Sequence, residues 1–567
     1  MSERTDALRS QAAREVHTLL EHGVEALGKR PRGHRGWMAM VKAALVGHHS
    51  GLKSGTGVVD VAERWLGELE ALQAPSGLFT SGDNLASPPD SAFTINDAAL
   101  TVAYLRRHAA EDALAPRLEG IMARALPALI TGGVHTPNHR WEIASALVAA
   151  GDLLGGDLAT AATHRAADWL GEGVDVDAEG LYSERSPNYA AYVSNPALLT
   201  LAQSLDRPEL AGIVHENLHA QLDLTAPDGG IETIHSRRQD QFDGPFPLGP
   251  FASHFAVFAA ECGRCRHGAR RALGAPDLDA VDVLVRTELD ERVAAGLRAA
   301  GRSAAVPEPE PPVDRWFAGP RLWRRSEGGH WSSVYGGSDV PAAGRIGSGL
   351  ATNPTFLRAG WGAVEFSAMR LSRDFFAMGP FRAEQAVREA DRMVLREELK
   401  TAYYQPLPER SRNAAGEYRL EHEGRFAAAM AFSERDADPV RLSTTVTYEP
   451  GTDGSLVSIG TEGAASGHAL EIALPADTSI EGAQDLGEGR YLLTGATTLR
   501  RGADTVVIEP DTASSADVEA TYDPGEAYTF LAGTDAMAGL RLYLTWRSPA
   551  TVRLHIRGGT PSTTETR

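Results

Sequence analysis

Apolar residues recur at helical spacing through roughly the first 300 residues. In WEIASALVAAGDLL, residues 141–154, the side chains of Ile143, Leu147, Ala150 and Leu154 fall on one helical face. Short connectors with Gly, Pro, Asp or Asn separate such patterns, and the lack of a repeat of fixed period favours a closed (α/α) toroid of helical hairpins over a regular solenoid. The further helices are predicted over roughly residues 6–28, 35–48, 57–73, 94–108, 111–129, 157–171, 193–205, 208–222, 250–262 and 277–300.

The pattern changes after GRSAAVPEPEPPVDR, residues 301–315, whose proline and acidic residues are typical of a linker. Beyond it, segments such as RLSTTVTYEP and LRLYLTWRS are short, rich in β-branched and aromatic residues, and separated by turn residues. This pattern predicts a large antiparallel β-sandwich. We therefore expect an N-terminal (α/α) toroid over residues 1–305, a linker over 306–316 and a C-terminal antiparallel β-sandwich over 317–560.

Composition narrows the function. The 567 residues carry 55 basic and 75 acidic side chains, a net charge of −20, which argues against a general nucleic-acid surface. An anionic ligand must therefore be held by a local cluster of cationic and amide groups. The N-terminus has no apolar core of signal-peptide length, and no apolar run is long enough for a membrane span. We expect a cytoplasmic protein that binds neither membrane nor nucleic acid.

The two cysteines, Cys262 and Cys265, stand in ECGRC. A lone CxxC is typical of a redox pair or of half a metal site. No second cysteine pair completes a zinc site, so we expect two reduced cysteines near a helix end. Since no ligand spacing indicates a metal in the cleft or the sandwich, we expect no cofactor. P-loop, GxGxxG, GxSxG and HExxH motifs are absent, which disfavours phosphoryl, hydride and serine-hydrolase chemistry.

The string TPNHRWE, residues 136–142, begins a predicted helix. Thr136 or Asn138 can cap that helix, and Pro137 suits its first turn. Capping accounts for one or two residues but leaves the rest of the run unexplained, and a helix N-terminus favours anions. We expect a catalytic role for Asn138 and His139, and substrate binding by Arg140, Trp141 and Glu142.

The string LYSERSPNYAAYVSN, residues 181–195, follows after one further helix, which in a hairpin array returns the chain to the same end of the bundle. Its residues can simply form a turn with two core tyrosines. An arginine beside a tyrosine, however, favours the phenolate. The catalytic candidates of this string are Glu184, Arg185, Tyr189 and Tyr192, and Asn188 is a candidate for substrate binding.

Three further stretches carry polar side chains. DGGIETIHSRRQDQFDG, residues 228–244, reads either as a solvated charged loop or as part of a site, with His235 a catalytic candidate. The long polar loop at residues 76–93 is typical of functional loops. In the predicted sandwich, SEGGHWSSVYGG contains His330, although a histidine in a strand is more often structural. The remaining substrate-binding candidates are Asp90, Phe93, Arg237, Arg238, Gln239, Asp240 and His330.

At TPNHRWE and EGLYSERSPNYAAY the sequence resembles the heparinase II/III-like superfamily of polysaccharide lyases, which includes alginate lyases. That family pairs an (α/α) toroid with a C-terminal antiparallel β-sandwich, and it places an Asn, often followed by His, in one toroid loop and a Tyr in a later loop. Asn138 and His139 match the first element, and Tyr189 or Tyr192 matches the second. A histidine of the sandwich commonly completes the family's cleft, but its equivalent here is not defined.

The resemblance implies β-elimination from a uronate-containing, anionic oligosaccharide. Asn138 and His139 would neutralise the uronate carboxylate, and a tyrosine near Arg185 would remove the C5 proton. Arg140, Arg185, Arg237 and Arg238 can bind carboxylate or sulfate groups, and Trp141 and Phe93 can stack on sugar faces.

The first alternative is a glycoside hydrolase on the same scaffold, with its carboxyl pair drawn from Glu142, Glu184, Asp90 and Asp240. The second is a carbohydrate-binding protein without catalysis. The glycan, endo or exo action and a homo-oligomeric state stay open.

Overall fold

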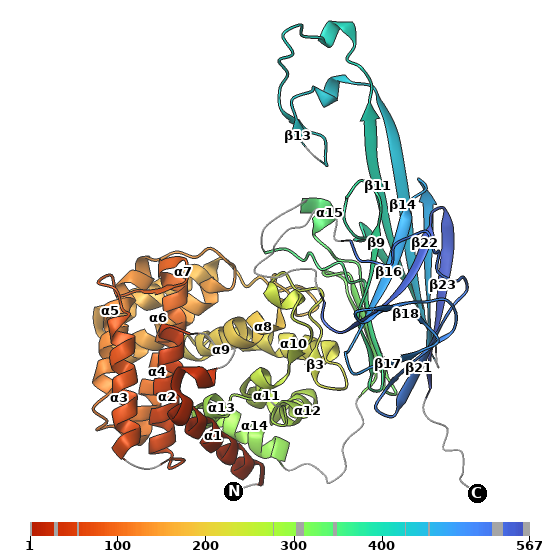
Figure 1. The fold of residues 1–567 in the computed structure, drawn as a ribbon. Coiled ribbons are helices and arrows are strands. Elements are labelled where there is room, and N and C mark those ends of the chain that lie inside the picture. The colour runs from red at the N-terminus through yellow and green to blue at the C-terminus, as the bar shows by residue number, and fades with distance from the viewer. Residues whose placement is uncertain are drawn as a thin grey trace, which may run out of the picture. The chain divides into compact units, whose positions relative to one another are not determined.

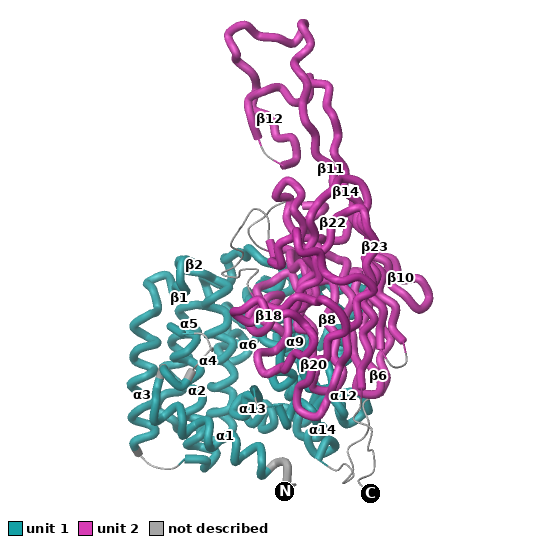
Figure 2. The backbone as a smooth tube through the Cα atoms, turned by 45° about the vertical axis from the view of Figure 1, so that its right-hand side comes forward, with its two compact units in different colours: residues 1–231, 245–309 teal, residues 232–244, 310–567 magenta. Residues whose placement is uncertain are grey.

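The computed structural model describes residues 3–27, 32–53, 56–275, 277–301, 311–343, 349–425, 427–451, 454–523 and 537–559. The chain forms two compact units, coloured separately in Figure 2. Unit 1 comprises residues 1–231 and 245–309, and unit 2 comprises residues 232–244 and 310–567. The short segment 232–244 therefore leaves the helical unit and packs in the sheet unit, which the predicted boundaries did not include.

Unit 1 is helical (Figure 1). Its α-helices are α1 Glu3–His22, α2 His34–His49, α3 Thr56–Ala71, α4 Pro88–His108, α5 Ala115–Thr131, α6 His139–Leu154, α7 Gly156–Gly171, α8 Pro187–Tyr189, α9 Asn195–Ser204, α10 Pro208–Leu224, α11 Ala252–Ala259, α12 Gly263–Ala272, α13 Ala280–Leu289 and α14 Glu291–Gly301. Its shorter elements are the 3-10 helices η1 Gly23–Leu27 and η4 Gly249–Phe251, the π-helical turn η2 Ala190–Ser194, and the strands β1 Phe79–Ser81, β2 Asn84–Ser87, β3 Gly230–Ile231 and β4 Phe246–Pro247.

The helices of unit 1 close into the expected toroid. Helices α2, α4, α6, α9, α10, α11 and α13 each pack on the next, and α13 returns to α2 and α4. A buried cation joins the two ends of this ring: Lys42 Nζ lies 2.6 Å from an Asp97 carboxylate oxygen on α4 and 3.1 Å from one of Asp282 on α13. Because removing one partner of a buried charge cluster is costly, Lys42 holds early and late helices together.

The predicted helices match this array closely, with three differences. The helix predicted from residue 94, α4, begins at Pro88, so Asp90 and Phe93 lie on this helix and not in a loop. The pattern over residues 277–300 is two helices, α13 and α14, separated at Asp290. Helix α12 was not predicted, because its sequence GRCRHGARRA is rich in arginine and buries only small residues and Cys265. Residues 306–310 of the predicted linker lie outside the described residues, and its last residues already belong to strand β5, which begins at Val313. None of the helices in the described ranges is long and apolar enough to cross a bilayer.

Unit 2 is the expected antiparallel β-sandwich. Its first large sheet has the order β10-β11-β14-β15-β23-β21-β20-β17, and the second has the order β18-β19-β22-β16-β9-β8-β7-β6-β5. Within these two sheets every pairing is antiparallel except that of β19 with β22. Their strands are β5 Val313–Phe317, β6 Leu322–Glu327, β7 His330–Tyr335, β8 Leu357–Trp361, β9 Val364–Arg373, β10 Gln385–Glu389, β11 Arg392–Tyr404, β14 Ala437–Pro450, β15 Gly454–Gly463, β16 Gly467–Leu474, β17 Ser479–Glu481, β18 Gln484–Gly487, β19 Arg490–Leu492, β20 Thr497–Arg501, β21 Asp504–Pro510, β22 Leu540–Arg547 and β23 Ala550–Gly559.

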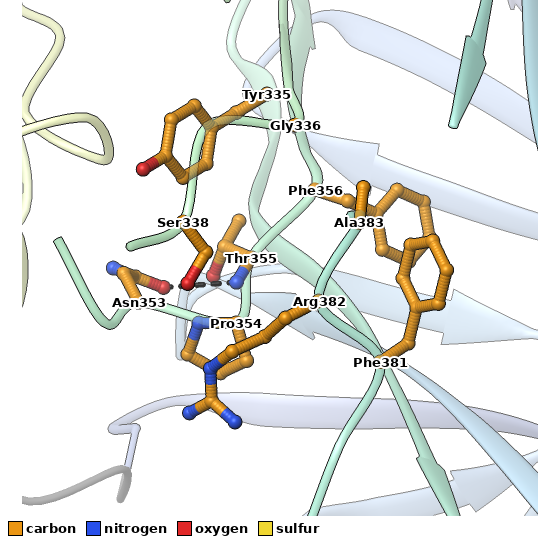
Figure 3. Close-up of a pocket in the computed structure, with 10 residues that line it drawn as sticks. All are labelled: Tyr335, Gly336, Ser338, Asn353, Pro354, Thr355, Phe356, Phe381, Arg382 and Ala383. Atoms are coloured by element: carbon orange, nitrogen blue, oxygen red, sulfur yellow. Dashed lines mark hydrogen bonds between the residues drawn. The ribbon is translucent and has the colours of Figure 1, made fainter. Parts of the chain in front are cut away.

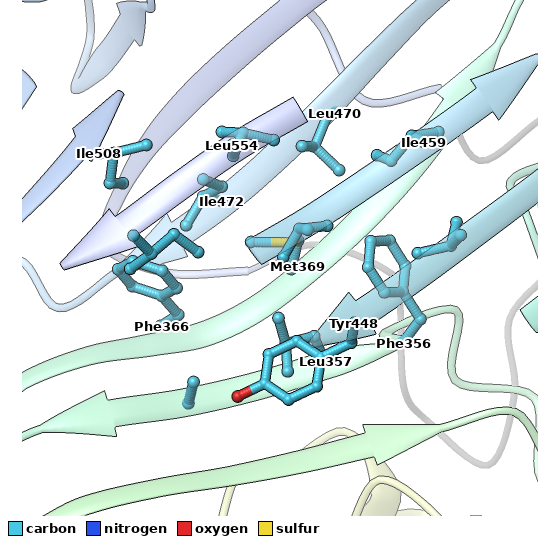
Figure 4. Packing of buried hydrophobic residues seen from close by; sticks show 14 of the residues in the cluster. Phe356, Leu357, Phe366, Met369, Tyr448, Ile459, Leu470, Ile472, Ile508 and Leu554 are labelled. Atoms are coloured by element: carbon cyan, nitrogen blue, oxygen red, sulfur yellow. The ribbon is translucent and has the colours of Figure 1, made fainter. Parts of the chain in front are cut away.

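Alternating side chains build the core between the two sheets (Figure 4). On β14, Leu442, Thr444, Val446 and Tyr448 are buried while the residues between them are more exposed, which is the period of a strand with one covered face. Across from them, Met369, Leu470 and Ile472 belong to the other sheet, and Figure 4 shows them facing this layer. The unit also holds short elements: α15 Val340–Ala343, η3 Gln239–Gln241, η5 Glu409–Ser411, η6 Phe432–Glu434, β12 Glu421–His422 and β13 Ala427–Ala428.

Candidate functional site

The first turn of α6 is tied to the loop that leads into α8. Arg140 Nη2 donates to Asp175 Oδ1 at 2.9 Å, and Trp141 Nε1 donates to the same oxygen at 3.3 Å. The other oxygen of Asp175 accepts the Ser183 hydroxyl, and the Ser183 amide donates to the Asp175 carbonyl at 2.9 Å. TPNHRWE and the start of LYSERSPNYAAYVSN therefore lie against each other, as their separation by one helix predicted.

Asn138 does not cap α6, although it occupies the N-cap position. Its side chain makes no capping hydrogen bond, because the amides of His139 and Arg140 donate to the carbonyls of Thr136 and Pro137, each at 3.3 Å. The Thr136 hydroxyl donates to Asn138 Oδ1 at 2.9 Å. Asn138 Nδ2 is buried and has no hydrogen-bond partner among the described residues, and the whole residue is only 3% exposed. A buried donor left unpaired is costly and calls for an acceptor that binds there.

Two rings pack against the His139 ring, and a cation lies over one of them. The rings of His135 and Phe93 meet the His139 ring edge to face, with centroids 4.9 and 6.4 Å away. Arg35, the second residue of α2, stands over Phe93 with its guanidinium carbon 3.7 Å from the ring centroid, and it pairs with Asp90. The candidate Phe93 thus lies against His139, while Arg35 engages both Phe93 and the candidate Asp90. No feature of the sequence near TPNHRWE pointed to Arg35.

Two residues of the first turn of α6 that were expected to contact substrate are engaged in structural contacts. Trp141 is 0% exposed, so its face cannot stack on a sugar. Arg140 is held by two carboxylates, since its Nη1 donates to Glu172 at 3.0 Å while its Nη2 donates to Asp175. Both side chains fix the position of the turn that carries Asn138 and His139.

Glu142 is also internal. Its carboxylate accepts a hydrogen bond of 2.7 Å from Asn96 Nδ2 on α4, and the same amide contacts the Ser145 hydroxyl at 2.9 Å. Burial raises the pKa of Glu142 to about 8, against the opposing effect of the Asn96 bond. The expected role of Glu142 at the substrate is not supported, because the group is buried in the packing of α4 on α6.

Tyr182 and Asn195, at the two ends of the second string, form a structural chain of hydrogen bonds. The Tyr182 hydroxyl donates to Asn195 Oδ1 at 2.8 Å, Asn195 Nδ2 donates to Asn217 Oδ1 at 3.1 Å, and Asn217 Nδ2 donates to the Gly180 carbonyl at 2.9 Å. Burial raises the pKa of Tyr182 far above its usual range. Tyr182 is therefore a framework residue, which leaves the other two tyrosines of the string as candidate bases.

Those two tyrosines lie on a continuous helical segment from Pro187 to Ser204 that contains a π-helical turn. The Ser186 hydroxyl caps its start by accepting the Tyr189 amide at 3.2 Å. Tyr189 is half-buried in the first turn, whereas Tyr192 lies on the π-helical turn η2, is 53% exposed, and meets Phe246 edge to face at 6.1 Å. Single π-helical turns occur frequently at functional sites.

The other candidates of this string lie just before the helical segment or in its first turn. Glu184 is buried, Arg185 adopts a left-handed backbone conformation with φ of 54°, and Asn188 is half-buried. A non-glycine residue in that conformation is uncommon and places the chain in a tight turn before Ser186. The turn therefore brings all three close to Tyr189 in the chain, while their roles stay predictions.

The segment 232–244 is anchored inside unit 2 by polar contacts. Glu232 and Arg358 form a buried ion pair with Oε1 and Nη1 2.8 Å apart. Burial alone would raise the pKa of Glu232, but the charges of Arg358 and Arg324 hold it at about 2. Arg237 binds Asp339 in a two-pronged pair, with both nitrogen–oxygen distances 2.9 Å. Of the two alternatives for this stretch, the solvated charged loop does not hold for Glu232 and Arg237.

The side chain of Gln241, which was not among the predicted site residues, anchors this segment by hydrogen bonds. Its Oε1 accepts the amides of Thr352 and Asn353 at 2.8 and 2.9 Å, and its Nε2 donates to the Leu350 carbonyl at 3.1 Å. Among the predicted residues, His235 is fully buried and Asp240 is buried with the Ser236 hydroxyl 2.5 Å from its Oδ1. Arg238 is half-buried and Gln239 is exposed. The substrate roles of these four residues stay predictions.

A small hollow lies beside the residues that Gln241 binds (Figure 3). Asn353 lines it and also donates from Nδ2 to the Gln241 carbonyl at 2.5 Å, while its Oδ1 accepts the Thr355 amide at 2.9 Å. Figure 3 shows the rings of Phe356 and Phe381 on one side of the hollow and the polar side chains on the other. The remaining lining residues are Tyr335, Gly336, Ser338, Pro354, Arg382 and Ala383.

His330 does not join this group. It lies at the start of β7, opposite Trp361 of β8. Tyr335, and Ser333, which lies opposite Arg358 in the β7–β8 register, are farther along the strand. The His330 ring stacks on Trp361 with centroids 4.7 Å apart, and burial with Arg325 nearby lowers its pKa to about 4. This placement corresponds to a packed structural histidine, so its expected substrate contact is not supported.

One set of side chains could hold a metal. His215, His219, Cys262 and Cys265, all in unit 1, bring one ligand atom each within 4.8 Å of one another. The sequence expectation counted only cysteines as partners for the CxxC pair and did not find this set. The signal was present as His-x3-His in VHENLHAQ.

No protein-family model matches the sequence, and no curated protein matches it. Among solved structures, the chain is similar to the heparan sulfate lyase HepC of Pedobacter heparinus, with 13% identity over 93% of this chain and 76% of that one and a TM-score of 0.45. It is similar to a heparinase III, with 9% identity over 98% and 85% and a TM-score of 0.49. It is also similar to a chondroitin AC lyase variant from Streptomyces coelicolor, with 12% identity over 99% and 78% and a TM-score of 0.48. Likeness of this degree assigns neither substrate nor mechanism to the chain.

Proposed function

We propose that this protein is a lyase that cleaves uronate-containing oligosaccharides by β-elimination. The observation that supports it best is Asn138, whose buried Nδ2 has no partner among the described residues although the residue stands at the start of α6. A buried amide donor beside a histidine suits an acceptor with negative charge, and a uronate carboxylate is such an acceptor. The reaction class is taken from the resemblance of TPNHRWE and SERSPNY to the lyase motifs.

The chemistry needs charge neutralisation and a base. The C5 proton of a uronate is weakly acidic because its loss places a second negative charge next to the carboxylate. Asn138 Nδ2 and the His139 ring would hydrogen-bond that carboxylate and stabilise the charge as it develops. A fixed donor of this kind changes kcat by about 100- to 1,000-fold in other enzymes. The −20 net charge of the chain makes such local donors necessary for an anionic substrate.

We propose Tyr189 as the base, ahead of Tyr192. Tyr189 follows the turn that Asp175 and Ser183 tie to the first turn of α6, and it is half-buried. Tyr192 is 53% exposed and packs its edge on Phe246. A base that is partly shielded from water loses less of its driving force to solvation. The phenolate of Tyr189 would take the C5 proton, and the phenol would return it to the leaving oxygen.

Hydrolysis by a carboxyl pair has less support. Glu142 is buried against Asn96, Asp90 pairs with Arg35, and Asp240 accepts a hydrogen bond from Ser236 in unit 2. Glu184, the fourth carboxyl, is buried in the turn before α8. Hydrolysis is accordingly the outcome that the test must separate from elimination.

The experiment is a screen of uronate oligosaccharides with ultraviolet detection of the conjugated, unsaturated product. Wild type is compared with Asn138→Ala, which removes the proposed donor, and with Asn413→Ala, a matched change of an exposed asparagine in unit 2 outside the candidate stretches. We expect a loss of about 100- to 1,000-fold in kcat for Asn138→Ala and none for Asn413→Ala. Equal activity of the two variants on a cleaved substrate would contradict the role of Asn138.

A further inference from the structure

Two helices of unit 1 present four metal-binding side chains to one point. His215 and His219 are one turn apart on α10 and therefore lie on the same helical face. Cys262 is the N-cap of α12 and Cys265 lies in its first turn. The four ligand atoms lie within 4.8 Å of one another. We propose that these residues form a zinc site that joins α10 to α12.

The distances suit a tetrahedral ion with little rearrangement. Zinc bonds of about 2.3 Å to sulfur and about 2.0 Å to nitrogen place neighbouring ligand atoms roughly 3.3–3.8 Å apart. His219 Nε2 and Cys262 Sγ are already 3.3 Å apart. The longest separation, up to 4.8 Å, requires only side-chain rotation toward a common centre. Ligands that already converge lose little conformational entropy when the ion binds.

The surroundings of the four ligands favour an ion over ordinary packing. His215 Nε2 is buried and has no hydrogen-bond partner among the described residues. The His215 ring lies 4.4 Å from the His219 ring and stacks on Phe258 at 4.8 Å, so packing fixes its orientation. Cys262 Sγ accepts the Cys265 amide at 3.3 Å, at a helix N-terminus that favours a thiolate. A polar nitrogen held in this way lacks a partner until a metal or a proton donor arrives.

The donor set indicates the ion and its role. Two thiolates and two neutral imidazoles are the ligands of closed structural zinc sites, and two thiolate charges balance the charge of Zn²⁺. Four protein ligands leave no open coordination position for water or substrate, so the site would stabilise and not catalyse. The spacing Cys-x2-Cys with His-x3-His also falls within the spacings of structural zinc sites.

The positions of the four ligands in the chain indicate what the zinc would stabilise. His219 and Cys262 are 43 residues apart, and residues 232–244, which pack in unit 2, lie between them. The segment that carries His235, Arg237 and Arg238 therefore leaves and re-enters unit 1 between the two halves of the zinc site. Zinc that binds the folded chain in preference to the unfolded one would stabilise unit 1 and fix α10 against α12.

The test uses the full chain, purified without chelator and without a metal-affinity tag. We expect about one zinc per chain by elemental mass spectrometry. After removal of zinc under reducing conditions, Co²⁺ should give the intense visible bands of tetrahedral coordination and a sulfur-to-cobalt charge-transfer band. Because the chain has two cysteines in all, that band reports on Cys262 and Cys265 without the need for a variant.

Variants then assign the nitrogen ligands. His219→Ala should lose the bound zinc, while His164→Ala, a change of an exposed histidine on α7, should retain it. If His219→Ala fails to fold, a thiol reagent added to folded wild type should still release one zinc as the two thiols react. Wild type that binds neither Zn²⁺ nor Co²⁺ when reduced would overturn the proposal. So would a Cys262–Cys265 disulfide in the purified protein together with failure to bind metal after reduction.

Discussion

Replacing Asp175 by alanine should destabilise unit 1. Asp175 accepts hydrogen bonds from Arg140, Trp141 and Ser183, and so joins the first turn of α6 to the loop before α8. In Asp175→Ala the Trp141 indole N–H stays buried, because Trp141 is 0% exposed, but it has lost its acceptor. The change therefore leaves a buried donor unsatisfied rather than removing a pair cleanly.

The size of the effect follows from two losses. An unsatisfied buried N–H costs about 1–3 kcal/mol, and losing a charge-assisted bond to Arg140 adds about 1 kcal/mol. The sum is about 2–4 kcal/mol in the free energy of unfolding of unit 1. Glu172→Gln is the matched control, because Glu172 also binds Arg140 but its side chain is 49% exposed, which limits its contribution to about 0–1 kcal/mol.

Thermal unfolding followed by far-ultraviolet circular dichroism measures the difference, because unit 1 contains most of the helix. We expect Tm of the helical transition to fall by about 5–10 °C in Asp175→Ala and by less than about 3 °C in Glu172→Gln. Activity should fall with the first variant, since the loop that positions Tyr189 is released. Equal shifts for the two variants would refute the argument that the buried indole makes Asp175 the essential partner.

Three further changes test other parts of the structure. Glu232→Gln should cost about 3–5 kcal/mol in unit 2, because Arg358 is left as an unpaired buried charge. Since the pKa of Glu232 is lowered to about 2, the stability that its charge provides is present above pH 4.5 and is lost as the pH falls toward 2. In urea titrations, Glu232→Gln should reduce this dependence of the unfolding free energy on pH. For Glu142 the pH dependence of stability has the opposite sign, because its pKa in the folded protein is raised to about 8. Stability therefore declines as the pH rises from about 4.5 to 8, and Glu142→Gln should make stability nearly constant over that range. Tyr189→Phe should abolish product formation in the absorbance assay while Tyr192→Phe keeps most of it, and full activity of Tyr189→Phe would identify Tyr192 or another group as the base.

The sequence predicted the elements whose pattern is carried by large apolar side chains. Strand β14 was found because its buried positions alternate with the period of a strand. Helix α6 was found from the helical spacing of Ile143, Leu147 and Ala150, although nearly all of its residues are buried and not one face alone. Helix α12 was missed because four of its ten residues are arginine and its buried residues are small. The excursion of residues 232–244 into unit 2 was missed as well, because its partners, Asp339 and Arg358 among them, are about 100 residues away in the chain.

The candidate site was also predicted only in part. That TPNHRWE and LYSERSPNYAAYVSN meet follows from the hairpin order, and Asp175 makes the contact. The burial of individual side chains could not be predicted, because the sequence of a turn does not show which of its side chains face the protein interior. For that reason Trp141 was expected at the sugar, although it is buried. Arg35 could not be found either, since it reaches Phe93 and Asp90 only through the packing of α2 on α4.

Cleavage in water enriched in heavy oxygen tests the proposed function most directly. Elimination breaks the glycosidic bond without water, so the product of a uronate oligosaccharide should carry a conjugated double bond and no solvent oxygen. Hydrolysis instead places a solvent oxygen on the new reducing end and forms no double bond. We predict ultraviolet absorbance with no heavy oxygen incorporated by mass spectrometry. Heavy oxygen in a product without that absorbance would contradict the lyase assignment.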